Sequence, residues 1–303
     1  MLTSVSSPDL HLLRVFKAIT DAGGFSAAQF VLNVSQSTIS TQMADLEARL
    51  GLRLCRRGRA GFSLTEDGHA IYDAANELFR GCDRFAEQVN KRRGSLTGEL
   101  RLALADALVG SPDFQIDKLL ERVREAMPMV TLVLENQGPL EIERNVLDQQ
   151  LHAGIHTFPN HAPGLRYVPL FTERQILFCG RSHPLFGKPD KETTLKEAES
   201  YDYAARSYYG GTLNLGTFRP TKSTASCASM EGVAAFILSG KYLGHLPIQV
   251  AKHWVVSGQM RPVLPDVTEY SSAFECVLSV GAQIGRPLEM FERLLAEHQS
   301  RAD

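Results

Sequence analysis

The segment FSAAQFVLNVSQSTISTQMADLEARL, from Phe25 to Leu50, decides how the N-terminal part of this chain folds. Ser26 can cap a first helix, because its hydroxyl can accept a hydrogen bond from a free backbone N–H. Asn33 then breaks the apolar pattern, since asparagine tolerates turn conformations, and Ser35 can cap a second helix. The apolar residues of that second helix recur at helical spacing: Ile39, Met43, Leu46 and Leu50. The segment therefore predicts two helices joined by a tight turn.

The opposite face of the second predicted helix starts with short polar side chains. They are Gln36, Ser37, Ser40 and Thr41. Short hydrogen-bonding side chains at a helix start, braced by another helix, suit insertion into the major groove of DNA. An ordinary helical hairpin has the same spacing, and on spacing alone it is the more common explanation. The flanking residues separate these two hypotheses.

Asp9 to Gly68 resembles, position after position, the N-terminal domain of LysR-type transcriptional regulators. The matching motifs, in order, are Asp21 to Phe25, Ser26-Ala27-Ala28, Leu32 to Gln36, Ser40 with Met43, Leu46-Glu47 and Leu50-Gly51, and a wing from 52–54 to 64–68. The sequence departs from the family pattern at Ser37, Thr41 and Cys55, where Pro, Arg or Lys, and Phe are common. The first two departures leave the base preference open.

The resemblance implies a winged helix-turn-helix over residues 1–64 that binds double-stranded DNA. The residues expected to contact DNA are Ser26, Ser35, Gln36, Ser37, Thr38, Ser40, Thr41, Arg57 and Arg59. In the wing, Arg57 matches a family arginine, whereas a second usual arginine falls at Ala60, next to Arg59. These arginines belong to a local cluster without acids between 49 and 59, although the whole chain has a formal net charge of -2. Such a cluster suits phosphate contacts, and a solvated charged loop is the alternative.

Residues 65–93 are expected to form one long helix, capped by Thr65. Its apolar residues alternate in steps of four and three, as in a heptad seam: Ile71, Ala75, Leu78, Cys82, Phe85 and Val89. The family resemblance implies that this linker helix pairs with that of a second subunit. The alternative is a helix that packs on its own domain. Residues 94–98 are expected to form a hinge.

From residue 99 onward, strands alternate with helices, which predicts an α/β domain. Strands are expected over 100–105, 130–134, 151–155, 167–170 and 175–179, and helices over 114–126 and 142–150. The motifs at 98–102, 127–130 and 239–247 resemble the effector domain of LysR-type regulators. That resemblance implies a periplasmic-binding-protein-like fold of two α/β lobes, residues 99–165 with 269–303 and residues 166–268. The fold class is therefore α/β overall, with an N-terminal winged helix-turn-helix and a long linker helix.

Loops at the carboxyl ends of the strands should line a cleft between the two lobes. The expected effector-binding residues are Ala105, Asp106, Ala107, Gly138, His156, Thr157, Ser207, Tyr208, Ser226, Ser229 and His245. Helix N-termini in such loops suit an anion. Asp106 instead suits an amine or a hydroxyl, so the charge of the effector is left open.

The composition is that of an ordinary globular protein, with 44% hydrophobic and 22% charged residues among 303. The five cysteines lack close paired spacing, which argues against a disulfide framework or a zinc site and fits a reducing compartment. The N-terminus lacks a basic stretch followed by a long apolar core, so no signal peptide is predicted. No apolar run is long enough to cross a bilayer. We therefore expect a cytoplasmic protein without a membrane partner.

Catalysis is the least favoured function. The histidines at 152, 156, 161 and 183 lack the spacing of metal ligands, and no Gly-x-Ser-x-Gly or glycine-rich phosphate loop occurs. Neither a cofactor nor a metal is expected. Two other functions stay open: a small-molecule binding protein whose helix-turn-helix serves assembly only, and a thiol redox-sensing regulator using two of Cys179, Cys227 and Cys276.

The favoured hypothesis is a LysR-type DNA-binding transcriptional regulator. The family implies a dyad-symmetric promoter site, a homodimer or homotetramer, and a small-molecule co-inducer in the cleft of the C-terminal domain. RNA polymerase is a further candidate partner.

Overall fold

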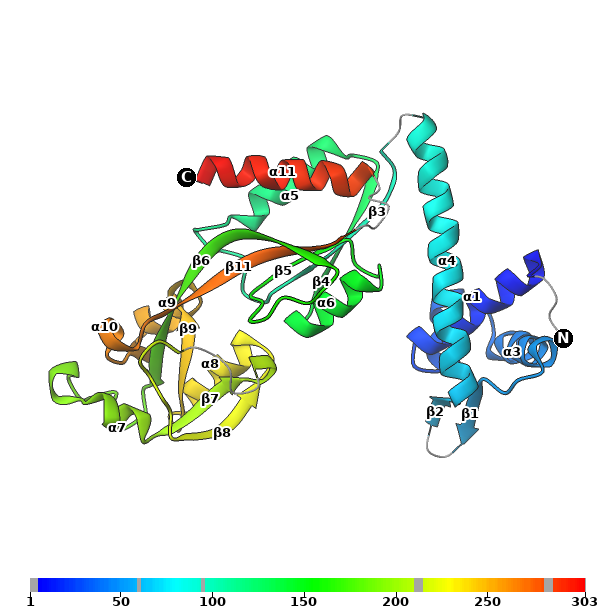
Figure 1. Cartoon of the computed structure of the whole chain (residues 1–303). Coiled ribbons are helices and arrows are strands. Elements are labelled where there is room, and N and C mark those ends of the chain that lie inside the picture. Colours follow the sequence, from blue (N-terminus) through cyan, green and yellow to red (C-terminus); the bar gives the residue numbers. More distant parts are fainter. Residues whose placement is uncertain (1–4, 59–60, 94–95, 210–214, 281–285, 303) are drawn as a thin grey trace. The chain divides into compact units, whose positions relative to one another are not determined.

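A computed structural model describes residues 5–58, 61–93, 96–209, 215–280 and 286–302 (Figure 1). Its internal contacts divide the chain into two units, Met1–Arg93 and Gly94–Asp303. No helix within the described ranges is long and apolar enough to cross a membrane.

The first unit contains the predicted helix-turn-helix. Its elements are α1 (Ser7–Asp21), α2 (Phe25–Leu32), α3 (Gln36–Leu50), β1 (Cys55–Gly58), β2 (Gly61–Leu64) and α4 (Glu66–Arg93). The predicted turn is confirmed, because Asn33 has a left-handed backbone with φ 52°. The Ser35 hydroxyl accepts from the Thr38 N–H at 3.2 Å, which confirms the cap of α3. The expected cap at Ser26 is wrong, since Ser26 lies inside α2. The helix begins at Phe25, and Gly24 is its N-cap.

The core of the first unit lies between α1, α3 and the start of α4. Ile39, Met43 and Leu46 of the predicted stripe are buried there, together with Phe16 and Ile19 of α1. Leu50 is half-buried at the edge of this core. The helical spacing of the apolar residues therefore identified the inner face of α3.

The predicted seam on α4 divides into two parts. Ala75 is buried in the core of the first unit, and Ile71 and Leu78 pack against the same core. The alternative of a helix that packs on its own domain is therefore confirmed for Ala75, because α1 and α3 need a third apolar surface to close their core. Ile71 and Leu78 are half-buried, and their contact with a second subunit stays a prediction. Further along the helix, Cys82 is exposed, Phe85 is 70% exposed and Val89 is 36% exposed. These last three residues, called the exposed seam below, have no such core against them.

The second unit is built on one path of paired strands, in the order β4-β3-β5-β11-β6-β9-β7-β8, with β10 paired to β6. The strands are β3 (Gly98–Leu104), β4 (Val130–Asn136), β5 (Ala153–His156), β6 (Leu165–Gly180), β7 (Asp202–Arg206), β8 (Lys222–Cys227), β9 (Leu243–Pro247), β10 (Met260–Pro262) and β11 (Tyr270–Ser279). The strands β6 and β11 run antiparallel and continue from one lobe into the other (Figure 1).

The long strand β6 corrects the sequence-based prediction of two separate strands over 167–170 and 175–179. The residues between them also pair with β11, as Phe171 does with Phe274 and Thr172 with Ala273. Partnership with a distant strand therefore keeps this stretch extended. The sequence around Phe171 carries no sign of that partner.

Helices cover both faces of the sheet in the first lobe. In Figure 1, α5 (Ile116–Ala126) and α11 (Arg286–Ala302) lie on one side and α6 (Pro139–Leu147) on the other. The alternation along β3 explains this arrangement, because successive strand residues point to opposite faces. Leu100 and Leu102 pack with the α5 and α11 side chains, whereas Ala103 packs with Ile142 and Val146 of α6.

The second lobe repeats the same design around the end of β6. Ile176 and Phe178 pack toward α8 (Met230–Leu238) and α9 (Ile248–Val256). Leu177 and Cys179 pack on the opposite face. The shorter helices of this lobe are η1 (Asp190–Glu192), α7 (Leu195–Glu199), η2 (Ser207–Tyr209) and α10 (Pro265–Thr268). Burial on both faces explains why β6 reads as a continuous apolar run here.

Candidate DNA-binding surface and effector cavity

The start of α3 presents an exposed polar surface. Gln36, Ser37, Thr38 and Thr41 are exposed, and Ser40 is half-buried. Hydroxyl contacts order this end of the helix, since Ser35 Oγ lies 2.8 Å from both Ser37 Oγ and Thr38 Oγ1. The Gln36 N–H donates to Gln29 Oε1 at 3.2 Å, which links α3 to α2. Ser26 is also exposed, on α2.

The predicted wing is a β-hairpin of β1 and β2, paired from Cys55–Leu64 to Gly58–Gly61. Arg57 lies in β1 opposite Phe62. The second predicted phosphate contact, Arg59, lies outside the described residues. Cys55 is buried where the family pattern has Phe. The hairpin is attached to α3, because the Leu54 N–H donates to Glu47 Oε1 at 2.8 Å.

A small cavity lies between the two lobes of the second unit, at the carboxyl ends of β3, β5 and β7. It is lined by Ala105, Asp106, His156, Thr157, Gln175, Tyr203, Ala204, Arg206, Tyr208, Met230, His245, Tyr270, Ser272 and Phe274. Its volume of about 20 Å³ is little more than the room that one water molecule needs. The walls come from strand ends of both lobes and from the crossing strands β6 and β11.

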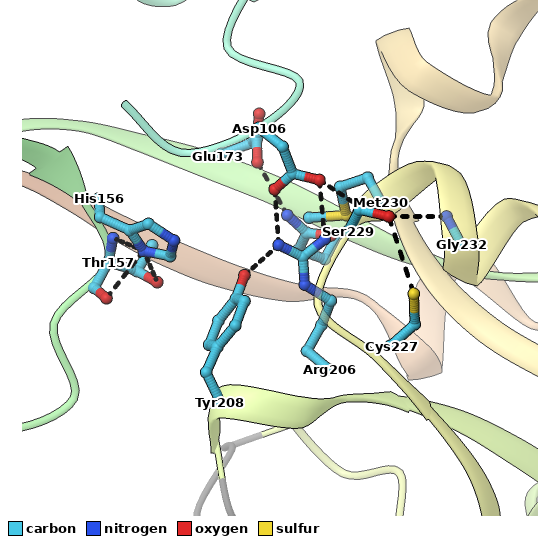
Figure 2. A network of polar contacts seen from close by, with 11 residues as sticks. Asp106, His156, Thr157, Glu173, Arg206, Tyr208, Cys227, Ser229, Met230 and Gly232 are labelled. Carbon is cyan, nitrogen blue, oxygen red and sulfur yellow. Dashed lines mark hydrogen bonds and ion pairs between the residues drawn. The ribbon is translucent and has the colours of Figure 1, made fainter. Parts of the chain in front are cut away.

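An ion pair closes this cavity from one lobe to the other (Figure 2). Arg206, at the end of β7, donates to Asp106 through Nη2 at 2.6 Å and Nη1 at 3.2 Å. The Met230 N–H, at the start of α8, donates to Asp106 Oδ2. The Arg206 guanidinium also contacts the Tyr208 hydroxyl and lies 4.7 Å from the centre of the Tyr208 ring. Asp106 thus holds two elements of the opposite lobe at once.

Arg206 is almost completely buried, with 6% of its side chain exposed. Its Nε atom has no hydrogen-bond partner among the described residues, and the same holds for Oε1 of Gln175, which also lines the cavity. Unsatisfied buried polar atoms are uncommon in folded proteins and cost free energy. The cavity therefore retains a donor and an acceptor that Asp106 leaves unused.

His156 faces the cavity as a neutral ring. Its Nδ1 accepts from the Thr157 N–H at 2.7 Å, so the ring proton is on Nε2. Burial lowers the pKa of His156 to about 4. The ring packs edge-to-face on Tyr208, with 5.2 Å between the ring centres. His156 can consequently donate to a ligand but brings no charge.

His245 is held by the protein on both sides. Its Nδ1 accepts from the Tyr203 hydroxyl at 3.0 Å, and its Nε2–H donates to the Thr268 carbonyl at 2.9 Å. Burial lowers its pKa to about 4. His245 therefore shapes the cavity wall and has no ring nitrogen left for a ligand.

The structure brings six of the eleven expected effector-site residues to the cavity: Ala105, Asp106, His156, Thr157, Tyr208 and His245. Ala107, Gly138, Ser207, Ser226 and Ser229 are not among its lining residues. Ser226 is exposed on the edge strand β8, and Ser229 caps α8 by accepting from the Gly232 N–H at 3.1 Å. Both serines belong to elements next to the cavity and do not line it.

The most important residue that the sequence analysis missed is Arg206. It is the charged residue at the carboxyl end of β7, directly before the predicted Ser207. That position is a signal that could have found it, because the carboxyl ends of strands line such clefts. Gln175, Ser272 and Phe274 come from the crossing strands, whose place beside the cavity depends on the long-range pairing.

Comparisons with known proteins agree with this architecture. The family model described as LysR substrate binding domain matches residues 93–300, and the model described as bacterial regulatory helix-turn-helix protein, lysR family, matches residues 10–69. The chain belongs to the LysR family. It is a DNA-binding transcriptional regulator with an effector-binding domain, as the sequence predicted.

Individual LysR relatives match over nearly their whole length. The HTH-type transcriptional activator BauR of Pseudomonas aeruginosa is 38% identical over 295 residues, which cover 97% of each chain. The SDS degradation transcriptional activation protein of a Pseudomonas species is 25% identical over 301 residues, again 97% of each. The crystal structure of full-length CbnR complexed with its target DNA is similar in fold, with a TM-score of 0.65 at 23% identity over 97% of this chain and 99% of that one.

Two of the three cysteines of the redox-sensing alternative, Cys179 and Cys276, are buried core residues of this LysR protein and poor redox groups. Burial raises the pKa of Cys179 to about 11 and that of Cys276 to about 12. The reactive form of a cysteine is the thiolate, and these two side chains stay protonated near neutral pH. The structure therefore gives no support to the redox-sensing alternative at these positions.

The first prediction concerns base recognition by the LysR helix-turn-helix. Replacing Gln36 by alanine should cost about 1–3 kcal/mol of binding free energy at the cognate site, because a side chain at the exposed start of α3 is placed to contact base edges. Gel shifts with cognate and scrambled duplexes measure the effect. The control is the scrambled duplex, on which affinity should stay unchanged, and equal losses on both duplexes would contradict base reading.

The second prediction concerns the pH dependence of stability. Glu173 is 4% exposed and accepts from Gln249 and Gln175. Burial raises its pKa to about 7, aided by the charges of Asp113 and Asp106 and opposed by Gln249, whereas an ordinary glutamate ionises near 4.5. A carboxyl group whose pKa is higher in the folded than in the unfolded chain contributes to the stability of the folded state at low pH. This contribution is complete below pH 4.5 and is lost as the pH rises through 7.

Glu173→Gln should therefore gain stability relative to the unmutated chain as the pH rises from 5 to 8. The expected relative gain is on the order of 2 kcal/mol. Urea unfolding of the effector domain at both pH values measures it. Glu141→Gln, which removes an exposed carboxylate, should show no such change. A Glu173→Gln curve parallel to that of the unmutated chain would show that Glu173 titrates normally.

Proposed function

We propose that this LysR family member is a transcriptional activator whose DNA binding depends on a second copy and whose activity is controlled by a small molecule at the Asp106–Arg206 cavity. The proposal rests on the nearly buried Arg206, which closes the space between two lobes. Among the described residues, its Nε atom and Gln175 Oε1 have no hydrogen-bond partner. Concave sites between lobes, with a few converging polar groups, are typical small-molecule sites.

The three similar proteins described above support activation and DNA binding. Both Pseudomonas relatives are named as activators, and CbnR was crystallised with its target DNA. In this chain, the start of α3 supplies the base-reading surface and the β1–β2 hairpin supplies the wing. An activator at a promoter acts next to RNA polymerase, which is the further partner in this proposal.

The exposed seam is the proposed contact to a second copy. Phe85 is an apolar side chain with 70% exposure, and Cys82 and Val89 lie on the same face of α4. Exposed apolar rows at heptad spacing on a long helix are typical of helix pairing. A dimer places two recognition helices on one duplex, which fits a dyad-symmetric site.

The cavity is proposed to bind its ligand without transforming it. A ligand regulates a protein only when it binds two conformations with different affinity. Asp106 and Arg206 belong to different lobes, so a ligand that separates them changes how the lobes are held together. The crossing strands β6 and β11 are the natural place for such a movement.

A bulky residue in the cavity wall tests the effector site. Ser272 is half-buried and lines the cavity, so Ser272→Trp should fill it while the separate DNA-binding unit stays folded. We expect the induction ratio of a promoter reporter to fall to about one, with unchanged gel shifts in the absence of inducer. The inducer is first identified by a thermal-shift screen of small metabolites on the unmutated chain.

Ser226→Trp is the matched comparison, because Ser226 is exposed on β8 and does not line the cavity. It carries the same added bulk in the same effector-binding unit. We expect normal induction from Ser226→Trp. Normal induction from Ser272→Trp, or loss in both variants, would contradict the proposed site.

A further inference from the structure

We propose that Asp106 occupies a built-in anion site, and that the effector is a small carboxylate that displaces Asp106 from Arg206 and from the start of α8. This inference rests on the proposed function of the cavity and adds the chemical class of the ligand. It also assigns Asp106 a role as an internal competitor of the effector.

Three donors converge on the Asp106 carboxylate, as Figure 2 shows. They are the two terminal nitrogens of Arg206 and the backbone N–H of Met230. Paired Arg nitrogens match the geometry of a carboxylate. The Met230 N–H belongs to the first turn of the nine-residue helix α8, where the helix dipole favours negative charge. The site therefore recognises a carboxylate, whichever molecule brings it.

The unpaired atoms indicate that Asp106 is not the only carboxylate this site is built for. Arg206 is 94% buried at its side chain, and its Nε donor has no partner among the described residues. Gln175 also lines the cavity, and its buried acceptor Oε1 has no partner among the residues that the structure describes. A free ligand that carries a second polar group next to its carboxylate can bind these atoms. The side chain of Asp106 has no polar group besides its carboxylate.

Charge and space favour displacement of Asp106 over simple addition of a ligand. The cavity of about 20 Å³ has no room for an organic acid beside Asp106. A second carboxylate beside Asp106 would face repulsion, with Arg206 as the guanidinium of the cavity lining to balance both charges. An entering carboxylate is accommodated when Asp106 leaves, since the charge around Arg206 then stays the same.

The loop that carries Asp106 is suited to such a movement. The next residue, Ala107, has φ 62°, a left-handed backbone that costs a residue with a Cβ about 1–2 kcal/mol. Asp106 itself is 21% exposed at its side chain, so water reaches it more readily than it reaches Arg206. Release of Asp106 can relax this loop and remove the link between β3 and the opposite lobe.

Acetate is a direct probe, because its carboxylate can replace the one that Asp106→Ala removes from the site. Calorimetry on the full chain should show acetate binding to Asp106→Ala at least about 10-fold more tightly than to the unmutated chain. Thermal unfolding should show the same order, with acetate raising the melting temperature of Asp106→Ala more than that of the unmutated chain. Acetamide, which has the same shape without charge, should do neither, with sodium chloride matching the ionic strength.

Three further variants define the site. Asp106→Ala combined with Arg206→Met should lose the acetate effect, because the guanidinium is gone. Asp117→Ala removes an exposed carboxylate from the same lobe and should behave like the unmutated chain. Asp106→Asn keeps the shape of the side chain and covers the case in which Asp106→Ala does not fold. It should also bind acetate about 10-fold more tightly than the unmutated chain.

The inference is overturned by equal acetate affinity in the unmutated chain and both Asp106 variants, or by equal effects of acetate and acetamide. These outcomes are separate from a failure of the proposed function. Loss of induction in Ser272→Trp without any acetate preference keeps the cavity as the effector site and rejects the carboxylate class. Acetate binding to Asp106→Ala with normal induction in Ser272→Trp supports the anion site and rejects its regulatory use.

Discussion

Gly68→Ala is expected to destabilise the DNA-binding unit by about 3 kcal/mol, at the upper end for an overpacked site. A Cβ at position 68 would lie 1.9 Å from the carbonyl oxygen of Leu54. That carbonyl cannot easily move, because it accepts from the Thr65 N–H at 3.0 Å where the hairpin returns. The Leu54 side chain is also fully buried in the core. Both anchors hold the wing against the first turn of α4.

Thermal unfolding of the full chain measures this effect. The transition of the first unit should fall by on the order of 10 °C, and DNA binding should be lost at temperatures where the unmutated chain still binds. The effector domain is a separate unit and should keep its own transition. His69→Ala, at an exposed neighbouring position, is the control and should change neither property. An unshifted transition for Gly68→Ala would mean that the hairpin moves freely with respect to α4.

Phe85→Asp is expected to dissociate the oligomer and to weaken DNA binding strongly. Phe85 is 70% exposed within one chain, so the substitution should leave the fold of that chain intact. Between two copies the same side chain would be buried, and an unpaired aspartate there costs several kcal/mol unless the interface opens. Loss of the second copy also removes the gain in avidity from two linked recognition helices.

Light scattering and gel shifts measure the two consequences of Phe85→Asp. The particle mass should fall to that of one chain at concentrations where the unmutated protein is larger. His69→Asp adds the same charge to the same helix on roughly the opposite face and should keep both the mass and the DNA affinity. If Phe85→Asp retains the larger mass, the contact between copies lies elsewhere.

Leu78 is an unsuitable position for a test of subunit contact. The heptad pattern placed Leu78 in the same seam as Phe85, and aspartate there would appear to test subunit contact. Leu78 packs against the core of its own unit, however. Aspartate at Leu78 would destabilise that core and lower DNA binding even in a protein that has no subunit contact. Only a substitution in the exposed seam can disrupt assembly while leaving the fold of the single chain intact.

The sequence alone determined the local features of this protein. Short-range signals specify the turn at Asn33, the cap at Ser35 and the buried face of α3, since each depends on residues within about two turns of helix. The family motifs are dense over the same segment, so the class of regulator was also readable. The loops after β3 and β5 were identified as cavity walls, because the carboxyl ends of strands in α/β sheets line their clefts.

The tertiary structure decided what depends on distant pairs of residues. It joined two predicted strands into β6 through pairing with β11, and it divided the seam of α4 between a core and a free surface. It also placed Arg206 against Asp106, one hundred residues away, and left Nε of Arg206 without a partner in the part of the chain that the structure describes. Neither residue signals its partner locally, because the contact exists only when two lobes close around the ends of their strands. The charge that the cavity recognises was therefore open in the sequence and became a testable proposal only with the structure.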